Sequence, residues 1–308
     1  MFPEVEGYTA AIPSKRDLLT FIKAIYAEVS AALLDGDGPL VQLVVRECLK
    51  SVDLFLTKVE GLIYSGPDAN RVSIEKGVFT KNPQQEHNSN LILLLLSLSE
   101  GLDKLLEKFL KVARDVKDHD VDQPAVSSLS LGSTSKGYLQ GLGEHAVSNT
   151  NSRPSPQLLL EDFVGKAKSK VTELLWVHLM LPLIDSLTGF VKGGLRAIYA
   201  EGIQAPVGET ALPSRAVQLL VKHLPELCKT VFGCFPVGDI VSQGVDEFAA
   251  RVKCLYVSTS TLLRPQSSGC RARTRADIHA LGAALRTIQQ DFKCKVVVAD
   301  DPVELECR

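Results

Sequence analysis

Four arginines lie close together near the C-terminal end of the sequence: Arg264, Arg271, Arg273 and Arg275. The arginine guanidinium group binds carboxylates and phosphates through two parallel hydrogen bonds, and the N-terminus of a helix binds anions. No aromatic residues or glycine-rich nest accompany these arginines, which argues against a nucleic-acid site. We expect a basic joint between two helices, able to contact acids on a neighbouring helix or a partner and, weakly, lipid head groups.

Two other short patterns could serve chemistry. Ser73 and Lys76 form an S-x-x-K pair, which serves as a nucleophile and base in some hydrolases. The glycines of residues 137–143 have the spacing of a phosphate-binding loop, but no preceding strand or lysine-serine pair accompanies them. We interpret the first as a chance match in a loop between helices, and the second as part of a linker.

Metal chemistry would need clustered acids or histidines. Asp300, Asp301 and Glu304 have a D-D-x-x-E spacing that could bind a divalent ion, but Pro302 interrupts it. His178 falls on an apolar helical face, where a hydrogen-bonded core histidine is expected more often than a ligand. We therefore expect no catalytic residue, no metal and no cofactor.

The composition favours a folded intracellular protein. The 308 residues carry 34 basic and 36 acidic side chains, so no overall field attracts the chain to nucleic acid. Seven cysteines show no C-x-x-C spacing, and we expect them reduced in the cytosol. The N-terminus has neither the basic nor the apolar segment of a signal peptide. The run LILLLL at residues 91–96 is far shorter than the ~20 residues of a membrane span and predicts a buried helix.

Apolar residues recur every three or four positions along most of the chain, as on one face of a helix. The pattern predicts an all-α fold, an elongated antiparallel bundle or rod of about seven long helices. Ser14 is placed to cap the first, and Pro182 and Pro225 are expected to kink two others. The apolar faces extend over residues 18–32, 41–62 and 91–116, and further helices are expected at 159–201, 214–232, 237–263 and 274–292.

Between these helices, residues 120–156 are dominated by serine, glycine, asparagine and proline without a period, which is typical of a disordered loop. We expect one helical segment at residues 1–119, this loop, a second helical segment at 157–293 and an irregular tail at 294–308. The β-branched start of that tail favours a short strand or no regular structure.

Four blocks of the sequence, taken in order, resemble one known family. They are residues 17–63, 83–106, 170–202 and 248–285, and the last contains the leucine-arginine-proline turn of Leu263, Arg264 and Pro265. Together they are similar to the C-terminal half of the subunit 5 family of the conserved oligomeric Golgi complex, a vesicle-tethering assembly. The long N-terminal half of that family is absent here, and residues 294–308 do not resemble it.

The resemblance implies a helical-rod subunit without catalytic residues. It implies a peripheral position on the cytosolic face of the Golgi membrane and a role in intra-Golgi retrograde transport. The implied partners are the other subunits of that complex, foremost subunit 7, with SNARE and Rab proteins. Two alternatives stay open: a scaffold subunit of another membrane-traffic complex such as exocyst, and an all-α metal-dependent enzyme that uses Asp300, Asp301 and Glu304.

Overall fold

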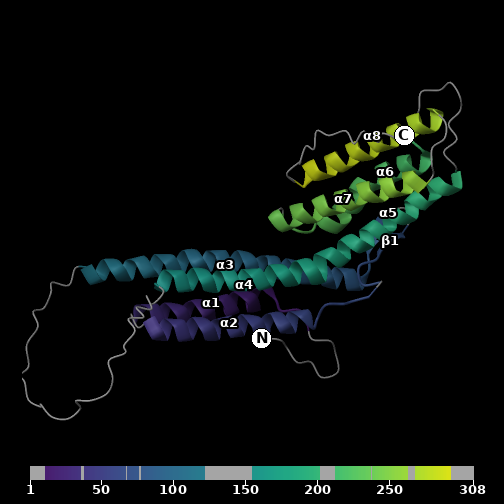
Figure 1. The fold of residues 1–308 in the computed structure, drawn as a ribbon. Helices are drawn as coiled ribbons and strands as arrows, with labels where there is room; N and C mark the ends of the chain where they lie inside the picture. The colour runs from purple at the N-terminus through teal and green to yellow at the C-terminus, as the bar shows by residue number, and fades with distance from the viewer. Residues whose placement is uncertain are drawn as a thin grey trace, which may run out of the picture. The chain divides into compact units, whose positions relative to one another are not determined.

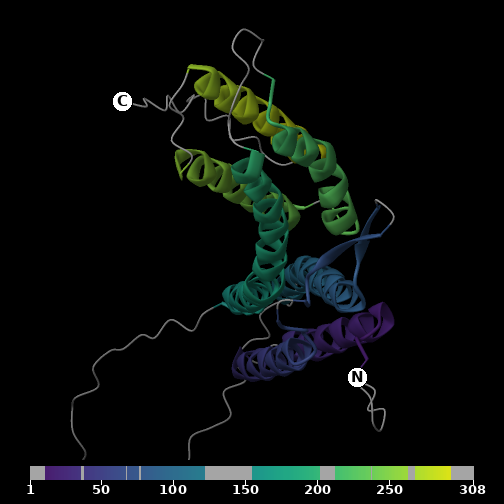
Figure 2. The same ribbon diagram turned by 90° about the vertical axis from the view of Figure 1, so that its right-hand side faces the viewer.

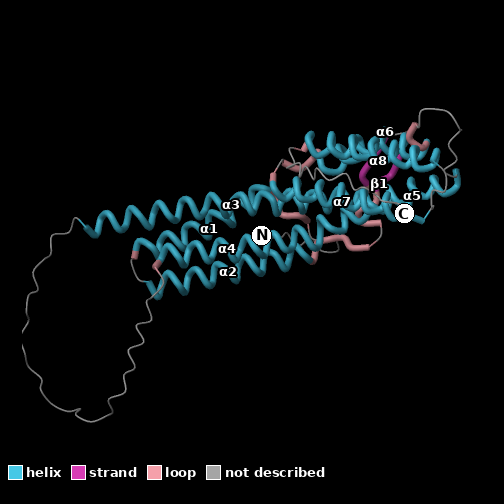
Figure 3. The backbone as a smooth tube through the Cα atoms, turned by 45° about the horizontal axis from the view of Figure 1, so that its top comes forward, coloured by secondary structure: helices cyan, strands magenta, loops and turns pink. Residues whose placement is uncertain are grey.

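The protein is seen here in a computed structural model that describes residues 11–35, 38–66, 68–75, 78–121, 155–201, 212–236, 238–262 and 268–292. In these ranges nearly the whole chain is helical, so the expected all-α helical bundle is confirmed (Figure 1). Figure 3 shows strand only in one hairpin. The elements are α1 (Lys15–Leu34), α2 (Gly38–Glu60), β1 (Val72–Glu75), β2 (Val78–Lys81), α3 (Pro83–Val121), α4 (Pro156–Glu173), the π-helix η1 (Leu174–Met180), α5 (Leu181–Glu201), α6 (Arg215–Phe232), α7 (Asp239–Leu262) and α8 (Ser268–Asp291).

The described chain divides into two compact units, each with its own core. Unit 1 contains residues 13–56 and 97–171, and unit 2 contains residues 57–96 and those from 172 onward. Neither unit is one continuous stretch, because α2, α3 and the helix from α4 to α5 each supply residues to both. The units therefore do not follow the expected segments 1–119 and 157–293. Most of the expected loop 120–156 and the whole tail 294–308 lie outside the described residues.

Unit 1 contains α1, α4 and parts of α2 and α3, which lie side by side in Figures 1 and 3. Ser14 caps α1 as predicted: its hydroxyl accepts from the Asp17 N–H, and the Asp17 carboxylate accepts from the Ser14 N–H. Phe21 of α1 stacks on Phe55 of α2, with ring centroids 5.1 Å apart. The predicted apolar faces form the core, including Leu18, Ile25, Val29, Val41, Val45, Cys48, Val52, Leu98, Leu102, Leu105 and Phe109.

Unit 2 contains a bundle of α5, α6, α7 and α8, of which Figure 2 gives a second view. Gly194 faces Leu220 while Phe190 and His223 both contact Phe79, so α5 and α6 run antiparallel. Gln289 of α8 bonds Asp246 of α7, and Asp277, earlier in α8, bonds Tyr256, later in α7, so α7 and α8 also run antiparallel. Burial of each large apolar side chain contributes roughly 1.5–3 kcal/mol to the stability of such a bundle.

The hairpin precedes α3, and polar side chains at the start of α3 hold the segment that leads into the hairpin. Asn82 caps α3 by accepting from the Gln85 N–H at 2.7 Å, and its amide donates to the Asp68 carbonyl. Asn88 binds both backbone groups of Tyr64, accepting from the N–H at 3.1 Å and donating to the carbonyl at 3.0 Å. The prediction of a loop around Ser73 is wrong, because Ser73 lies in β1 opposite Thr80 of β2.

The π-helix explains an error in the predicted apolar face. Pro182 lacks the N–H that an α-helix requires, and its ring would crowd the carbonyl four residues earlier. The chain widens just before it, so that the Leu181 N–H donates to the carbonyl of Trp176, five residues back. Each such turn holds about one extra residue, which shifts the buried positions from His178 to Leu179. His178 is therefore not a core residue, since its side chain is 46% exposed.

Candidate functional site

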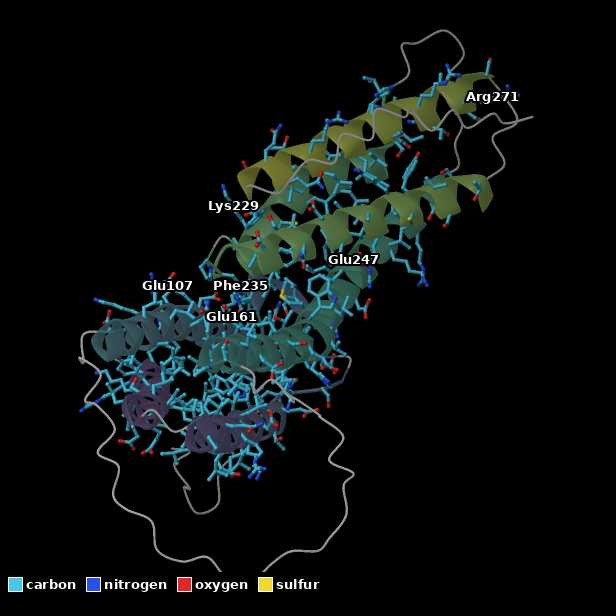
Figure 4. All side chains as sticks on the ribbon, turned by 60° about the vertical axis from the view of Figure 1, so that its left-hand side comes forward. Glu107, Glu161, Lys229, Phe235, Glu247 and Arg271 are labelled. Atoms are coloured by element: carbon cyan, nitrogen blue, oxygen red, sulfur yellow. The ribbon has the colours of Figure 1, made fainter. Side chains whose placement is uncertain are left out.

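Three of the four arginines of the predicted basic joint lie within a helix. α8 begins at Ser268, six residues earlier than expected, so Arg271, Arg273 and Arg275 occupy its first two turns. Arg271 and Arg275 are exposed and four residues apart, and they therefore share one face. Figure 4 shows Arg271 near one end of α8 and Lys229 of α6 toward the other end of the bundle. Arg264 lies outside the described residues.

Arg273 has a structural environment. It stands four residues before Asp277, whose carboxylate is 3% exposed. Asp277 accepts from the Ser214 backbone N–H at 2.5 Å and from the Tyr256 hydroxyl at 3.1 Å. Burial raises the pKa of Asp277, while the bond from Ser214 and the charge of Arg273 act in the opposite direction. Burial raises the pKa of Tyr256 as well, so its hydroxyl stays protonated and donates. This cluster joins α6, α7 and α8.

A groove of about 900 Å³ within unit 2 offers more room for a ligand. The hairpin forms one wall, through Arg71, Val72, Ser73 and Phe79, and α5 and α6 form the others. Phe79 is buried and meets two rings edge-on, Phe190 of α5 at 5.7 Å and His223 of α6 at 6.0 Å between centroids. Ser186 of α5 donates to the Asn70 carbonyl at 2.8 Å and so ties the wall to the helix.

Glycines of α5 open the groove. A Cβ placed on Gly189 or Gly193 would meet no atom within 4 Å, while one on Gly194 would come within 2.9 Å of the Leu220 side chain. Gly194 therefore allows α5 and α6 to approach closely, and the other two glycines leave space unfilled. Leu219 of α6 also lines the groove and is 51% exposed, although it is apolar. Volumes of 300–1,000 Å³ and mainly apolar walls are typical of ligand sites.

The remaining residues singled out in the sequence do not converge. Ser73 lines the groove, but Lys76 lies outside the described residues. His178 stands 3.8 Å from the exposed carboxylate of Glu60. The residues 137–143 and the acids Asp300, Asp301 and Glu304 also lie outside the described part. Among the residues that are described, no group of three or more histidines, cysteines and acids is placed to hold a metal ion.

The structure describes five cysteines as free thiols, two of them buried, two exposed and one, Cys270, of intermediate exposure. Cys48 and Cys228 are buried, and burial raises the pKa of Cys48 to about 11 and that of Cys228 to about 12. Cys234 and Cys254 are exposed. The Lys81 ammonium lies 3.0 Å from the Cys234 sulfur and 5.6 Å from the centre of the Phe235 ring, which anchors the end of β2 on α6.

One helix of the described chain, Pro156–Arg196, is long and apolar enough to cross a membrane, judged by length and composition only. The core helices of folded proteins pass the same test, and this one supplies buried residues to both units.

Comparison with known proteins adds no assignment. No family model, no curated protein and no solved structure matches the chain. The groove was missed in the sequence because the hairpin was read as a loop. The sequence does indicate a hairpin, because two runs with β-branched and aromatic residues, VSIE and VFTK, are separated by only the two residues Lys76 and Gly77.

Proposed function

We propose that the protein is a non-enzymatic subunit of a vesicle-tethering complex, acting in intra-Golgi retrograde transport through contacts made by its helix faces. The four ordered blocks that resemble subunit 5 of the conserved oligomeric Golgi complex motivate the proposal. The expected position is on the cytosolic face of the Golgi membrane. The expected partners are the other subunits of that complex, foremost subunit 7, with SNARE and Rab proteins as further contacts.

Exposed leucines on α2 are the observation that supports this function best. Leu43 and Leu54 are 47% and 60% exposed, whereas the opposite face of this helix buries Val41, Val45, Val52 and Val59. Eleven residues are three helical turns, so the two side chains lie on one face, about 16 Å apart along the axis. Between them the same face carries the exposed ion-paired side chains of Glu47 and Lys50, so a helix of another subunit would meet two apolar contacts with charges between them.

Isolation of the tagged full chain from cells tests the proposal. We expect the other subunits of the conserved oligomeric Golgi complex to co-purify, and a fluorescent fusion to label the Golgi. Recovery of exocyst subunits instead would favour the alternative scaffold. If neither subunit 7 nor the rest of the Golgi complex is recovered, the proposal is wrong.

Two variants of α2 test the contact itself. Replacement of Leu43 and Leu54 by aspartate should reduce co-purification and leave the helical circular dichroism unchanged, because both side chains are exposed. The matched control replaces Leu158 of α4, which is 58% exposed in the same unit. Equal loss of partners in the control would show that the α2 face has no special role.

A further inference from the structure

We propose that the groove of unit 2 binds an extended segment of a partner protein, in which a few alternating apolar residues stand between two carboxylates, and that this segment pairs with the free edge of β1. The inference goes beyond the tethering function and does not depend on which complex the chain joins. It rests on the strand edge, the groove floor and the charges at the two ends of the groove.

The edge of β1 runs along the groove. Successive side chains of an extended chain point to opposite faces, so a groove that touches Arg71, Val72 and Ser73 in succession follows the edge of this chain segment. In the described part of the protein, β1 pairs only with β2. Alternate residues of β1 therefore direct their N–H and carbonyl groups away from the hairpin. An added strand would bind these groups, as in other cases of strand addition.

The floor suits small apolar side chains. Leu219 is half exposed, and Gly189 and Gly193 leave open space above α5. An extended segment places every second side chain on one face, so alternating valine or isoleucine residues could fill this space while the residues between them face water.

Arginines stand at both ends of the groove. Arg71 lies at the end where Ser186 bonds to Asn70, and its pair with Asp68, at 3.5 Å, is exposed on both sides. Arg196 stands three residues after Gly193 and Arg215 four before Leu219, so both extend the groove-lining rows of their helices. Both are exposed, and no carboxylate of the described residues forms an ion pair with either. The ends are therefore complementary to anionic groups.

The separation of the two ends sets the length of the segment. Ten residues of α5, from Ser186 to Arg196, span about 15 Å. An extended chain covers the same distance in four or five residues, at roughly 3.3 Å each. The partner segment should therefore carry an acid, about four residues with alternate apolar side chains, and a second acid.

Binding of a synthetic peptide to the full chain tests the inference. The probe is fluorescein-labelled Asp-Val-Thr-Val-Thr-Asp with a blocked C-terminus, and its anisotropy is measured at low and physiological salt. We expect saturable binding that weakens with salt, and about tenfold weaker binding when lysines replace the two aspartates. A probe with N-methylated valines should also bind weakly, because it cannot donate to the strand edge.

Protein variants locate the site. Gly193→Leu should fill the groove and abolish binding, whereas Gly165→Leu, at a second helical glycine with no atom near its Cβ position, should bind as the wild type does. Arg71→Glu and Arg215→Glu should each weaken binding of the acidic probe and improve that of the lysine probe. Circular dichroism and melting of each variant confirm that it is folded.

Several outcomes would overturn the proposal. One is no saturable binding, or equal binding of the acidic, lysine and N-methylated probes. A second is equal loss of binding in the Gly193 and Gly165 variants. A third is binding only after residues 293–308 are removed, which would make the chain's own end the occupant. A failed co-purification with Golgi subunits would leave the peptide result standing, so the two proposals can fail separately.

Discussion

The backbone N–H of Ser214 donates to the buried carboxylate of Asp277 across 2.5 Å, which fixes the first turn of α6 against the third turn of α8. The same carboxylate accepts from Tyr256 of α7. Three helices therefore meet at one acidic side chain that neighbours the arginines of α8. Arg273 therefore has a structural role, because its charge lowers the pKa of Asp277 and so acts against the effect of burial.

Asp277 should make stability fall as the pH rises. Burial raises its pKa in the folded protein, so the folded state retains a proton that the unfolded chain has already lost. The stabilising contribution is complete below the unfolded pKa and disappears as the pH rises through the folded pKa. Asp277→Asn should remove this part of the slope because an amide does not ionise. The protein should stay folded, since the amide oxygen can still accept from the Ser214 N–H. Urea unfolding between pH 4 and pH 8 measures it, with the exposed Glu161→Gln as control. An unchanged slope in Asp277→Asn would contradict the assignment.

Phe79 should hold the hairpin on unit 2. It is 4% exposed and packs edge-on against Phe190 and His223. Phe79→Ala should lower the free energy of unfolding by roughly 3–5 kcal/mol. Its neighbour Val78 is 55% exposed, so Val78→Ala should change the same quantity by less than about 0.5 kcal/mol. Chemical denaturation of both variants tests the contrast, and a similar loss in both would show that Phe79 has no special packing role.

Gln85 should be replaceable by an apolar residue. Its side chain is fully buried, and neither its amide nitrogen nor its amide oxygen has a hydrogen-bond partner within the described structure. An unpaired buried polar group costs about 1–3 kcal/mol, so the similarly shaped Gln85→Met should raise the melting temperature. Asn88→Leu should lower it, because Asn88 makes two bonds to the Tyr64 backbone. A lower melting temperature for Gln85→Met would indicate that an ordered water bonds the amide.

Four of the five described thiols should react in two classes. Cys234 and Cys254 are exposed and should be alkylated by iodoacetamide in the native protein within minutes at pH 8. Cys48 and Cys228 have a raised pKa and are buried, so they should react only as the protein unfolds. Peptide mass spectrometry with and without urea distinguishes them. Rapid native labelling of Cys228 would mean that the bundle of unit 2 opens far more readily than its packing suggests.

Helical periodicity was sufficient to predict most of the fold. Along α2 and α3 the apolar residues predicted to share one face recur every three or four positions, and nearly all of those that the structure describes are buried as expected. The same reasoning failed at His178, because a proline altered the hydrogen-bond spacing of the preceding turn. Periodicity carries no information on the two compact units, which depend on which helices pack together rather than on the order of the chain.

The groove was harder to predict than the helices. One wall is a hairpin, and the two helices that form the other walls come more than one hundred residues later in the sequence. No residue of the walls differs in type from those of an ordinary helix or strand. The start of α8 was placed too late for a different reason. Arg271 and Arg275 lie on an exposed face, and a polar face carries no apolar period from which a helix could be recognised.

The widened turn before Pro182 has a consequence for changes in chain length. Removing any one residue of Leu174–Met180 would allow ordinary i→i+4 bonding to resume there. The residues downstream would keep their faces, because the widened turn already holds the one extra residue. Leu183, Leu187 and Val191 would therefore stay buried. The same deletion within the ordinary α-helical part of α5 would rotate everything beyond it by about 100° about the helix axis, so a single-codon deletion should be tolerated better within these seven residues than in the helix that follows them.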